Sequence, residues 1–212
     1  MDRSNPAPVT LWEAGRTSTR SLSLLGEEPL SIRVEGKPYA VVMRTPGDEI
    51  AHAAGFSLGE GIIDSAADCS SVALCEGENL NAVTVTLTPS RRAAVGGVLD
   101  RRGYLSQTSC GICGKTSIDS VFQRFPAVKG AWSVSPALIA SMPDKLRAAQ
   151  ETFSQTGGLH ASGLFDLEGN LLVLREDVGR HNALDKIIGH ALQQNLLPLD
   201  RHILLVSGRV SF

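Results

Sequence analysis

Two cysteines three positions apart carry the most reactive chemistry in the chain. They lie in a glycine-flanked loop, Ser109-Cys110-Gly111-Ile112-Cys113-Gly114-Lys115. Thiols at this spacing can reach each other, hold one metal ion together, or pass a sulfur atom from one to the other. Gly111 and Gly114 remove side-chain bulk around the thiols, and the Lys115 cation favours the thiolate, the form that attacks and that binds metal. The loop is therefore predicted to be a nucleophile, a metal knuckle or a redox pair.

The metal and redox alternatives need further features around the loop. A structural zinc site needs four ligands. Cys69 and Cys75 could complete one, but their spacing is not that of a knuckle, and Cys75 lies in a strand-like run where a buried thiol is ordinary. A thioredoxin-like pair would be expected inside a βαβ unit, whereas this loop follows a β-rich segment. Sulfur or electron handling by a reactive thiol is favoured, and no structural metal is expected.

Cytidine-deaminase chemistry is disfavoured by the residues near a second candidate, His160. That chemistry uses a His-x-Glu whose carboxylate moves protons, followed later in the chain by Pro-Cys-x-x-Cys. Here Ser162 stands where the glutamate would be, Ser109 precedes the first cysteine, and the two motifs come in the reverse order. His160 taken alone indicates only a histidine satisfied by a backbone carbonyl.

A polar turn before a helix forms the second informative stretch. It reads Arg175-Glu176-Asp177-Val178-Gly179-Arg180-His181-Asn182-Ala183-Leu184-Asp185-Lys186. A strand, a polar turn and a helix start present free backbone N–H groups and a positive helix end to an anion. A capped helix with a solvated face would look similar, but a glycine, an arginine and a histidine in one turn favour phosphate or nucleotide binding.

The helix itself is predicted from an apolar stripe that begins after Asn182. Its members are Ala183, Leu184, Ile187, Ile188, Ala191 and Leu192. This spacing places them on one helix face and leaves Asp185, Lys186 and Gln193 pointing outward.

Composition excludes several partners and compartments. The 212 residues can bury a substantial core, and 20 Lys and Arg against 22 Asp and Glu show no basic surface for nucleic acid. The N-terminus lacks a signal peptide, the apolar runs are too short to span a bilayer, and four cysteines are too few for a disulfide framework. We expect a cytoplasmic protein with no membrane and no nucleic-acid partner.

Three segments are expected along the chain, in a mixed α+β or α/β fold. Residues 1–19 are predicted to be a loose N-terminal arm, because they carry Pro6 and Pro8 and show little periodicity. Residues 20–130 are predicted to form a β-rich α+β part that ends in the cysteine loop, with a hairpin over 30–43 and a helix after Asp48. Residues 131–212 form the third part, and the chain stops just after an apolar strand, so we expect that part to be truncated at its C-terminal end.

Several of these motifs together resemble the FdhD family of formate dehydrogenase accessory sulfurtransferases. The resemblance runs from about Glu28 to the end, and the string from Glu176 to Lys186 is its most specific element. The other matching motifs are Glu28-Pro29-Leu30, Gly55-Phe56 with Gly59-Glu60-Gly61-Ile62-Ile63, the loop from Ser109 to Gly114, Thr156-Gly157-Gly158-Leu159-His160-Ala161 and Ser207-Gly208-Arg209.

The resemblance implies a sulfur carrier. A cysteine desulfurase would load a persulfide on Cys110, with Cys113 as its partner or relay, and the sulfur would pass to the molybdenum of a bis(molybdopterin guanine dinucleotide) cofactor, here a bound substrate destined for formate dehydrogenase. It also implies a cytidine-deaminase-like C-terminal part without zinc chemistry, and a homodimer. We assign the nucleotide site to His160, Gly179, Arg180, His181, Asn182 and Lys186. Two alternatives stay open: a cofactor-delivery chaperone without chemistry of its own, and a zinc-stabilised structural module.

Overall fold

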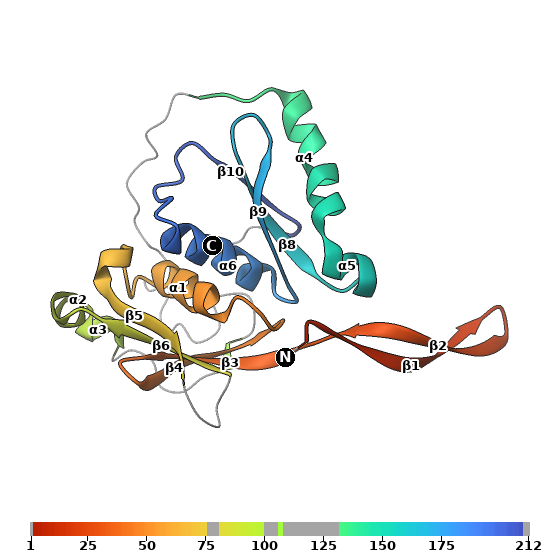
Figure 1. Ribbon diagram of the computed structural model, residues 1–212, viewed down its shortest axis with the longest axis horizontal. Coiled ribbons are helices and arrows are strands. Elements are labelled where there is room, and N and C mark those ends of the chain that lie inside the picture. Colours follow the sequence, from red (N-terminus) through yellow and green to blue (C-terminus); the bar gives the residue numbers. More distant parts are fainter. Residues whose placement is uncertain (1, 76–80, 100–105, 108–131, 210–212) are drawn as a thin grey trace.

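The structure is a computed structural model that describes residues 2–75, 81–99, 106–107 and 132–209. Its elements confirm a mixed α+β fold in which two sheets enclose a pair of helices (Figure 1). The cysteine loop, with Cys110 and Cys113, lies outside the described residues.

The N-terminal segment is a β-hairpin, so the prediction of a loose arm over 1–19 is wrong. Strand β1 (Ser4–Glu13) pairs antiparallel with β2 (Arg16–Leu25) from the Ser4–Leu25 pair to the Glu13–Arg16 pair. A two-residue turn joins them, with φ of 48° at Ala14 and 80° at Gly15. Positive φ at both central residues matches the twist of the flanking strands. Pro6 and Pro8 do not prevent the strand, because an edge strand tolerates proline where the N–H would point to solvent. The hairpin projects from the body as an arm (Figure 1).

The first sheet has five strands in the order β5-β6-β3-β4-β7. Strands β3 (Glu28–Val34) and β4 (Lys37–Arg44) form the predicted hairpin around Glu35-Gly36. Strand β6 (Ala82–Leu87) pairs parallel with β3 and antiparallel with β5 (Cys69–Leu74), and β7 (Ser106–Gln107) pairs parallel with β4. A short 3₁₀ turn (Ala66–Asp68), α2 (Pro89–Ala94) and α3 (Gly96–Leu99) lie at the ends of these strands.

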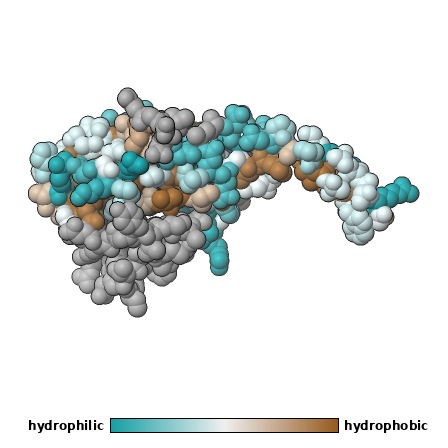
Figure 2. Space-filling model, turned by 90° about the horizontal axis from the view of Figure 1, so that it is seen from below, coloured by the Kyte–Doolittle hydropathy of each residue, from teal (hydrophilic) through white to brown (hydrophobic). Residues whose placement is uncertain are grey.

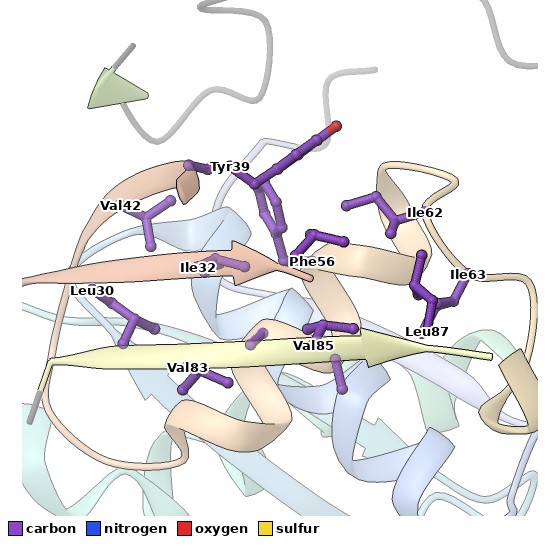
Figure 3. Close-up of a cluster of buried hydrophobic side chains, with 14 of the residues drawn as sticks. Leu30, Ile32, Tyr39, Val42, Phe56, Ile62, Ile63, Val83, Val85 and Leu87 are labelled. Atoms are coloured by element: carbon purple, nitrogen blue, oxygen red, sulfur yellow. The ribbon is translucent and has the colours of Figure 1, made fainter. Parts of the chain in front are cut away.

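One face of this sheet is packed against helix α1 (Glu49–Gly59), which begins where the turn after Thr45 predicts. Alternate apolar residues of the strands meet Phe56 of α1 and Ile62 and Ile63 beyond it (Figure 3). The Phe56 ring stands edge-on to that of Tyr39, with 6.2 Å between ring centroids. This cluster is the larger of the two described hydrophobic cores.

The second sheet has the order β10-β8-β9 and is antiparallel throughout. Its strands are β8 (His160–Phe165), β9 (Leu171–Asp177) and β10 (Ile203–Val206). One face packs against α4 (Pro136–Ala149), with α5 (Glu151–Thr156) at its end. Helix α4 begins at Pro136, which takes the first helical position, and the Ser135 side chain caps it by accepting a hydrogen bond from Leu138 N at 3.2 Å.

Helix α6 (Arg180–Gln193) lies between the second sheet and α1 (Figure 1). It crosses α1 at backbone contact: a Cβ on Gly55 would stand 1.9 Å from the Asp185 carbonyl oxygen, and one on Gly189 would stand 1.7 Å from that of Ala51. Two glycines, one from each helix, therefore permit the crossing. Because α6 is covered on two sides, an outward Lys186 is wrong: that residue is fully buried, and Asp185 is half-buried. Gln193 is exposed, as predicted.

Candidate anion site at the start of helix α6

Asp177, at the end of β9, organises the turn that leads into α6. Its Oδ1 accepts hydrogen bonds from Gly179 N (2.9 Å) and Asn182 Nδ2 (2.9 Å), so the carboxylate holds the turn in place of a capping side chain at Gly179. Its Oδ2 accepts from Thr45 N (3.1 Å) and lies 2.8 Å from Lys186 Nζ. The carboxylate thus binds both the turn and the segment that precedes α1.

Lys186 is committed to this buried cluster. Its Nζ also donates to the Thr45 carbonyl oxygen at 2.9 Å, and no part of the residue is exposed. Burial lowers the pKa of the Lys186 ammonium, and the Asp177 carboxylate opposes that shift. Lys186 therefore stabilises the turn from within the protein and is not exposed to a ligand. Asn182 acts in the same way, since its Nδ2 donates to Asp177 and to the Met43 carbonyl oxygen at 2.7 Å.

A second group of residues meets beside Arg180, in the first turn of α6. Ser207, just after β10, accepts a hydrogen bond from Ala161 N at 2.8 Å through its Oγ, which lies 3.2 Å from His160 Nδ1. Gly208 then passes so close that an added Cβ would lie 3.0 Å from Arg180 Cδ and 3.5 Å from His160 Cε1. The Ser207-Gly208 turn therefore brings His160 and Arg180 together across three chain segments.

Arg180 is the group in this set best placed to receive a ligand. It is half-buried in the first turn of α6, and its Nε is buried without a hydrogen-bond partner among the described residues. A buried guanidinium nitrogen without a partner is unfavourable, and an oxygen of a bound anion would satisfy it. The positive end of α6 acts in the same direction. The arrangement fits a phosphate group.

The structure thus brings two of the predicted site residues, His160 and Arg180, together beside Gly208, and Gly179, immediately before Arg180, is itself buried. Asn182 and Lys186 lie behind them, and His181 is half-buried in the same helical turn. From the sequence, Ser207 and Gly208 are indicated only as part of a motif that resembles the family. Asp177 is one of several charged residues near the start of this helix, and nothing in its spacing predicts that it is fully buried.

The described residues contain no group of three or more His, Cys, Asp and Glu side chains placed to hold a metal ion. The sulfur of Cys75 lies 3.2 Å from Thr84 Oγ1, and burial raises the pKa of the Cys69 thiol, with Asp68 adding to the shift. Because Cys110 and Cys113 lie outside the described residues, the absence of a structural metal stays a prediction. Within the described part, no helix is both long and apolar enough to cross a bilayer.

Two further polar residues, Arg44 of β4 and His52 of α1, are fully buried near Lys186 and are not predicted from the sequence. Arg44 is fully buried and bonds Asn81 Oδ1 at 2.8 Å and Glu49 Oε1 at 3.1 Å. His52 is also fully buried, and burial lowers its pKa to about 3, with Lys186 and Arg44 adding to the shift. His52 is therefore neutral at physiological pH.

Acid should destabilise the protein through His52. The folded pKa of about 3 is below the unfolded value of 6.5, so the unfolded state binds more protons between those limits. Stability is expected to fall as pH drops below 6.5, by up to about 5 kcal/mol on this account. His52→Gln should flatten the fall between pH 6.5 and 4 in urea unfolding. His202→Gln removes a half-buried histidine outside this layer, and the same flattening there would contradict the assignment.

Comparison with known proteins first establishes the class of fold. A crystal structure of a protein assigned as a formate dehydrogenase accessory protein, from Desulfotalea psychrophila, superposes with a TM-score of 0.70. The match covers 98% of this chain and 74% of that one, at 20% identity. At that identity the likeness concerns the fold.

Sequence comparison identifies the family. The model of the FdhD/NarQ family matches residues 25–212. The chain is 46% identical over 210 residues to the "Sulfur carrier protein FdhD" of Streptomyces avermitilis, covering 93% of this chain and 73% of the relative. It is 42% identical over 210 residues to the protein of that name from Mycobacterium tuberculosis, covering 94% and 75%. The chain belongs to the FdhD/NarQ family.

Proposed function

We propose that this protein is a sulfur carrier that serves formate dehydrogenase. It accepts sulfur from a cysteine desulfurase in the cytoplasm, holds it as a persulfide on Cys110, and passes it to the molybdenum of the bis(molybdopterin guanine dinucleotide) cofactor. Family membership carries the proposal, because relatives at 40–47% identity are named sulfur carrier proteins. The similar crystal structure is that of a protein assigned as a formate dehydrogenase accessory protein.

The anion site supports a nucleotide-bearing substrate. The buried Arg180 Nε and the start of α6 are suited to a phosphate, and the guanine dinucleotide ends of the cofactor carry phosphates. Ser162, which stands where the His-x-Glu of a deaminase would have its glutamate, is fully buried on β8 and offers no carboxylate for deamination.

The sulfur transfer balances with thiol groups alone. The Cys110 thiolate attacks the outer sulfur of the desulfurase persulfide; a new S–S bond forms on Cys110, and the desulfurase thiolate leaves. Sulfur then leaves Cys110 as sulfide if the Cys113 thiolate attacks the inner sulfur, because the two cysteines become a disulfide and supply the two electrons. Cys113 can alternatively take over the outer sulfur as a relay, with no change in oxidation state.

Sulfur loading is tested with radiolabelled cysteine and a cysteine desulfurase. We expect label on the wild-type protein that a thiol reductant releases, and at least about tenfold less on Cys110→Ala, because the acceptor thiolate is gone. Cys69→Ala and Cys75→Ala are matched controls and should load as wild type. Releasable label retained by Cys110→Ala would show that Cys110 is not the carrier.

Complementation separates sulfur transfer from delivery without chemistry. In a strain that lacks its own accessory protein, the Cys110→Ala/Cys113→Ala variant should fail to restore formate dehydrogenase activity. Restoration by this variant, at equal protein level, would favour the delivery chaperone. About one zinc per chain that is lost in the same variant would favour the structural module.

The nucleotide site is tested with guanosine diphosphate as the probe. Arg180→Ala should weaken its binding about 10- to 100-fold, since a charge-assisted hydrogen bond contributes roughly 1.5–3 kcal/mol. Arg16→Ala removes the same charge at the exposed end of the hairpin and should leave the dissociation constant unchanged. Calorimetric titration measures both, and equal effects would reduce the role of Arg180 to general electrostatics.

A further inference from the structure

Ser207 replaces a backbone acceptor with its side chain at the end of β10. Strand β10 pairs with β8 as far as the Val206–Ser162 pair, and Ser207 N then donates to the Ala161 carbonyl oxygen at 2.9 Å. In an antiparallel ladder, two residues bonded in this way also exchange the reverse bond, from N–H to a backbone carbonyl. Here Ala161 N donates instead to Ser207 Oγ, at 2.8 Å. The hydroxyl therefore takes the place of the Ser207 carbonyl, and the chain is free to leave the sheet at Gly208.

The same hydroxyl lies beside the ring of His160. Ser207 Oγ is 3.2 Å from His160 Nδ1. Side chains alternate between the two faces of a strand, so His160 points to the opposite face of the sheet from Ala161, the next residue. Ala161 packs against Met142 and Leu146 of α4. His160 therefore lies on the face of the sheet that α6 covers.

The hydrogen-bonding capacity of Ser207 determines which ring nitrogen of His160 carries the proton. A serine hydroxyl has one proton and two lone pairs, and one lone pair accepts from Ala161 N. The hydroxyl then either donates to His160 Nδ1 or accepts from it. A hydroxyl that already accepts a hydrogen bond is polarised into a better donor, and an imidazole nitrogen readily accepts from serine. Donation by the hydroxyl leaves Nδ1 without a proton, so a neutral His160 carries its proton on Nε2.

We propose that Ser207 is a positioning residue, which holds His160 in the Nε2–H tautomer so that the ring donates to an anionic oxygen beside Arg180. Ala161 N–H, the Ser207 hydroxyl and His160 Nε2–H then form one chain of donors that ends on the ligand. Gly208 brings the two side chains to one place, because its absent Cβ would lie 3.5 Å from His160 Cε1 and 3.0 Å from Arg180 Cδ. The ligand in this inference rests on the proposed nucleotide site, and the tautomer does not.

The tautomer decides what the imidazole offers to a phosphate oxygen. With its proton on Nδ1, the ring would present Nε2 as an acceptor, which repels the lone pairs of an anionic oxygen. With its proton on Nε2, His160 adds a neutral donor to the guanidinium of Arg180, whose Nε is buried without a partner among the described residues. Two donors from different chain segments can bind one phosphate group.

Nitrogen NMR of the free protein tests the tautomer directly. Two-bond proton–nitrogen correlations of the histidine rings distinguish a protonated from an unprotonated nitrogen at about pH 8.5, where an ordinary imidazole is neutral. Wild-type His160 should show a protonated Nε2 and an unprotonated Nδ1. Ser207→Ala should lower the ratio of the Nε2–H to the Nδ1–H form about fivefold, since one hydrogen bond is lost, and Ser207→Thr should restore it.

An internal reference for this spectrum is His190, whose Nδ1 lies 3.4 Å from Arg175 Nη2. Its tautomer should be the same in the wild type and in both Ser207 variants. A wild-type His160 that carries its proton on Nδ1 would overturn the proposal. If Ser207→Ala does not fold, the spectra of the wild type and of Ser207→Thr decide, and both must show the proton on Nε2.

Guanosine diphosphate binding tests the consequence for a ligand. Ser207→Ala should raise the dissociation constant about fivefold, and Ser207→Thr should leave it within about twofold of the wild-type value. In a His160→Ala background, Ser207→Ala should cause no further loss, because a positioning residue acts through its partner. An equal loss in both backgrounds would mean that Ser207 only holds β10 in place, and would overturn the proposal.

A serine outside this cluster gives the matched control. Ser18 is exposed on β2, in the hairpin that extends from the body (Figure 2). Ser18→Ala should change neither the tautomer of His160 nor the dissociation constant, and a change in both like that of Ser207→Ala would overturn the proposal. If the wild-type protein binds no guanosine diphosphate, the proposed nucleotide site fails, and the NMR spectra still decide the role of Ser207.

Discussion

Replacing Gly55 by alanine is expected to lower the free energy of unfolding by about 3 kcal/mol or more. The added Cβ would stand 1.9 Å from the Asp185 carbonyl oxygen and 2.8 Å from Gly189 N, both backbone atoms of α6. Backbone cannot move aside as a flexible side chain can, so α1 and α6 would have to separate. Their separation would loosen the contact between the two sheets. Urea unfolding followed by circular dichroism measures the loss.

The control for this variant lies one turn along the same helix. A Cβ on Gly59 would meet only Asp185 Oδ1, at 4.0 Å. Gly59→Ala should therefore change stability by less than about 1 kcal/mol, the scale of the intrinsic helix preference. Similar losses for Gly55→Ala and Gly59→Ala would mean that the helices do not cross at backbone contact.

Replacing Asp177 by asparagine is expected to destabilise the protein by about 3–5 kcal/mol, because it leaves the Lys186 ammonium buried without a countercharge. Lys186 Nζ lies 2.8 Å from Asp177 Oδ2, and neither side chain is more than 1% exposed. The same change weakens the hydrogen bonds that the Asp177 side chain accepts from Gly179 N and Thr45 N. Because these bonds position the turn, guanosine diphosphate binding there should weaken as well. Unfolding in urea and calorimetric titration report the two effects separately.

The double variant Asp177→Asn/Lys186→Met separates the charge pair from the rest of the cluster. Removing both charges eliminates the unpaired ion, so the double variant should be more stable than Asp177→Asn alone. Additive losses from Asp177→Asn and Lys186→Met would show that the two groups do not interact in the folded state.

Local patterns predicted most of the regular structure near the site. The alternation from Leu30 to Val34 and the stripe from Ala183 to Leu192 gave the correct element types, because a strand and a helix each place residues at a fixed period. The same rules failed at the N-terminus. Pro6 and Pro8 led to the prediction of a loose arm, but two prolines two positions apart share one edge of a strand, where the lack of an N–H is tolerated.

The anion site at the start of α6 stays a prediction from residue types. Which of its residues are exposed and which are buried could not be predicted from the sequence. Gly179, Arg180 and His181 in one turn indicate a phosphate site from residue types alone. The amphipathic pattern placed Lys186 and Asp185 on the outer face, since a helix packed on one side should expose its charges. The structure covers α6 on both sides, so Lys186 became a buried partner of Asp177.

The sequence by itself identified the family and predicted a reactive thiol pair at Cys110 and Cys113, which stays a prediction, because both depend on residue types at short spacing. Tertiary structure alone decided which charges stand at the surface of the turn and which stabilise it from within. It also brought Ser207 and Gly208 to His160 and Arg180, residues separated along the chain whose meeting depends on sheet order and helix crossing. Local sequence encodes the period of an element, but the faces that become buried are set by what packs against it.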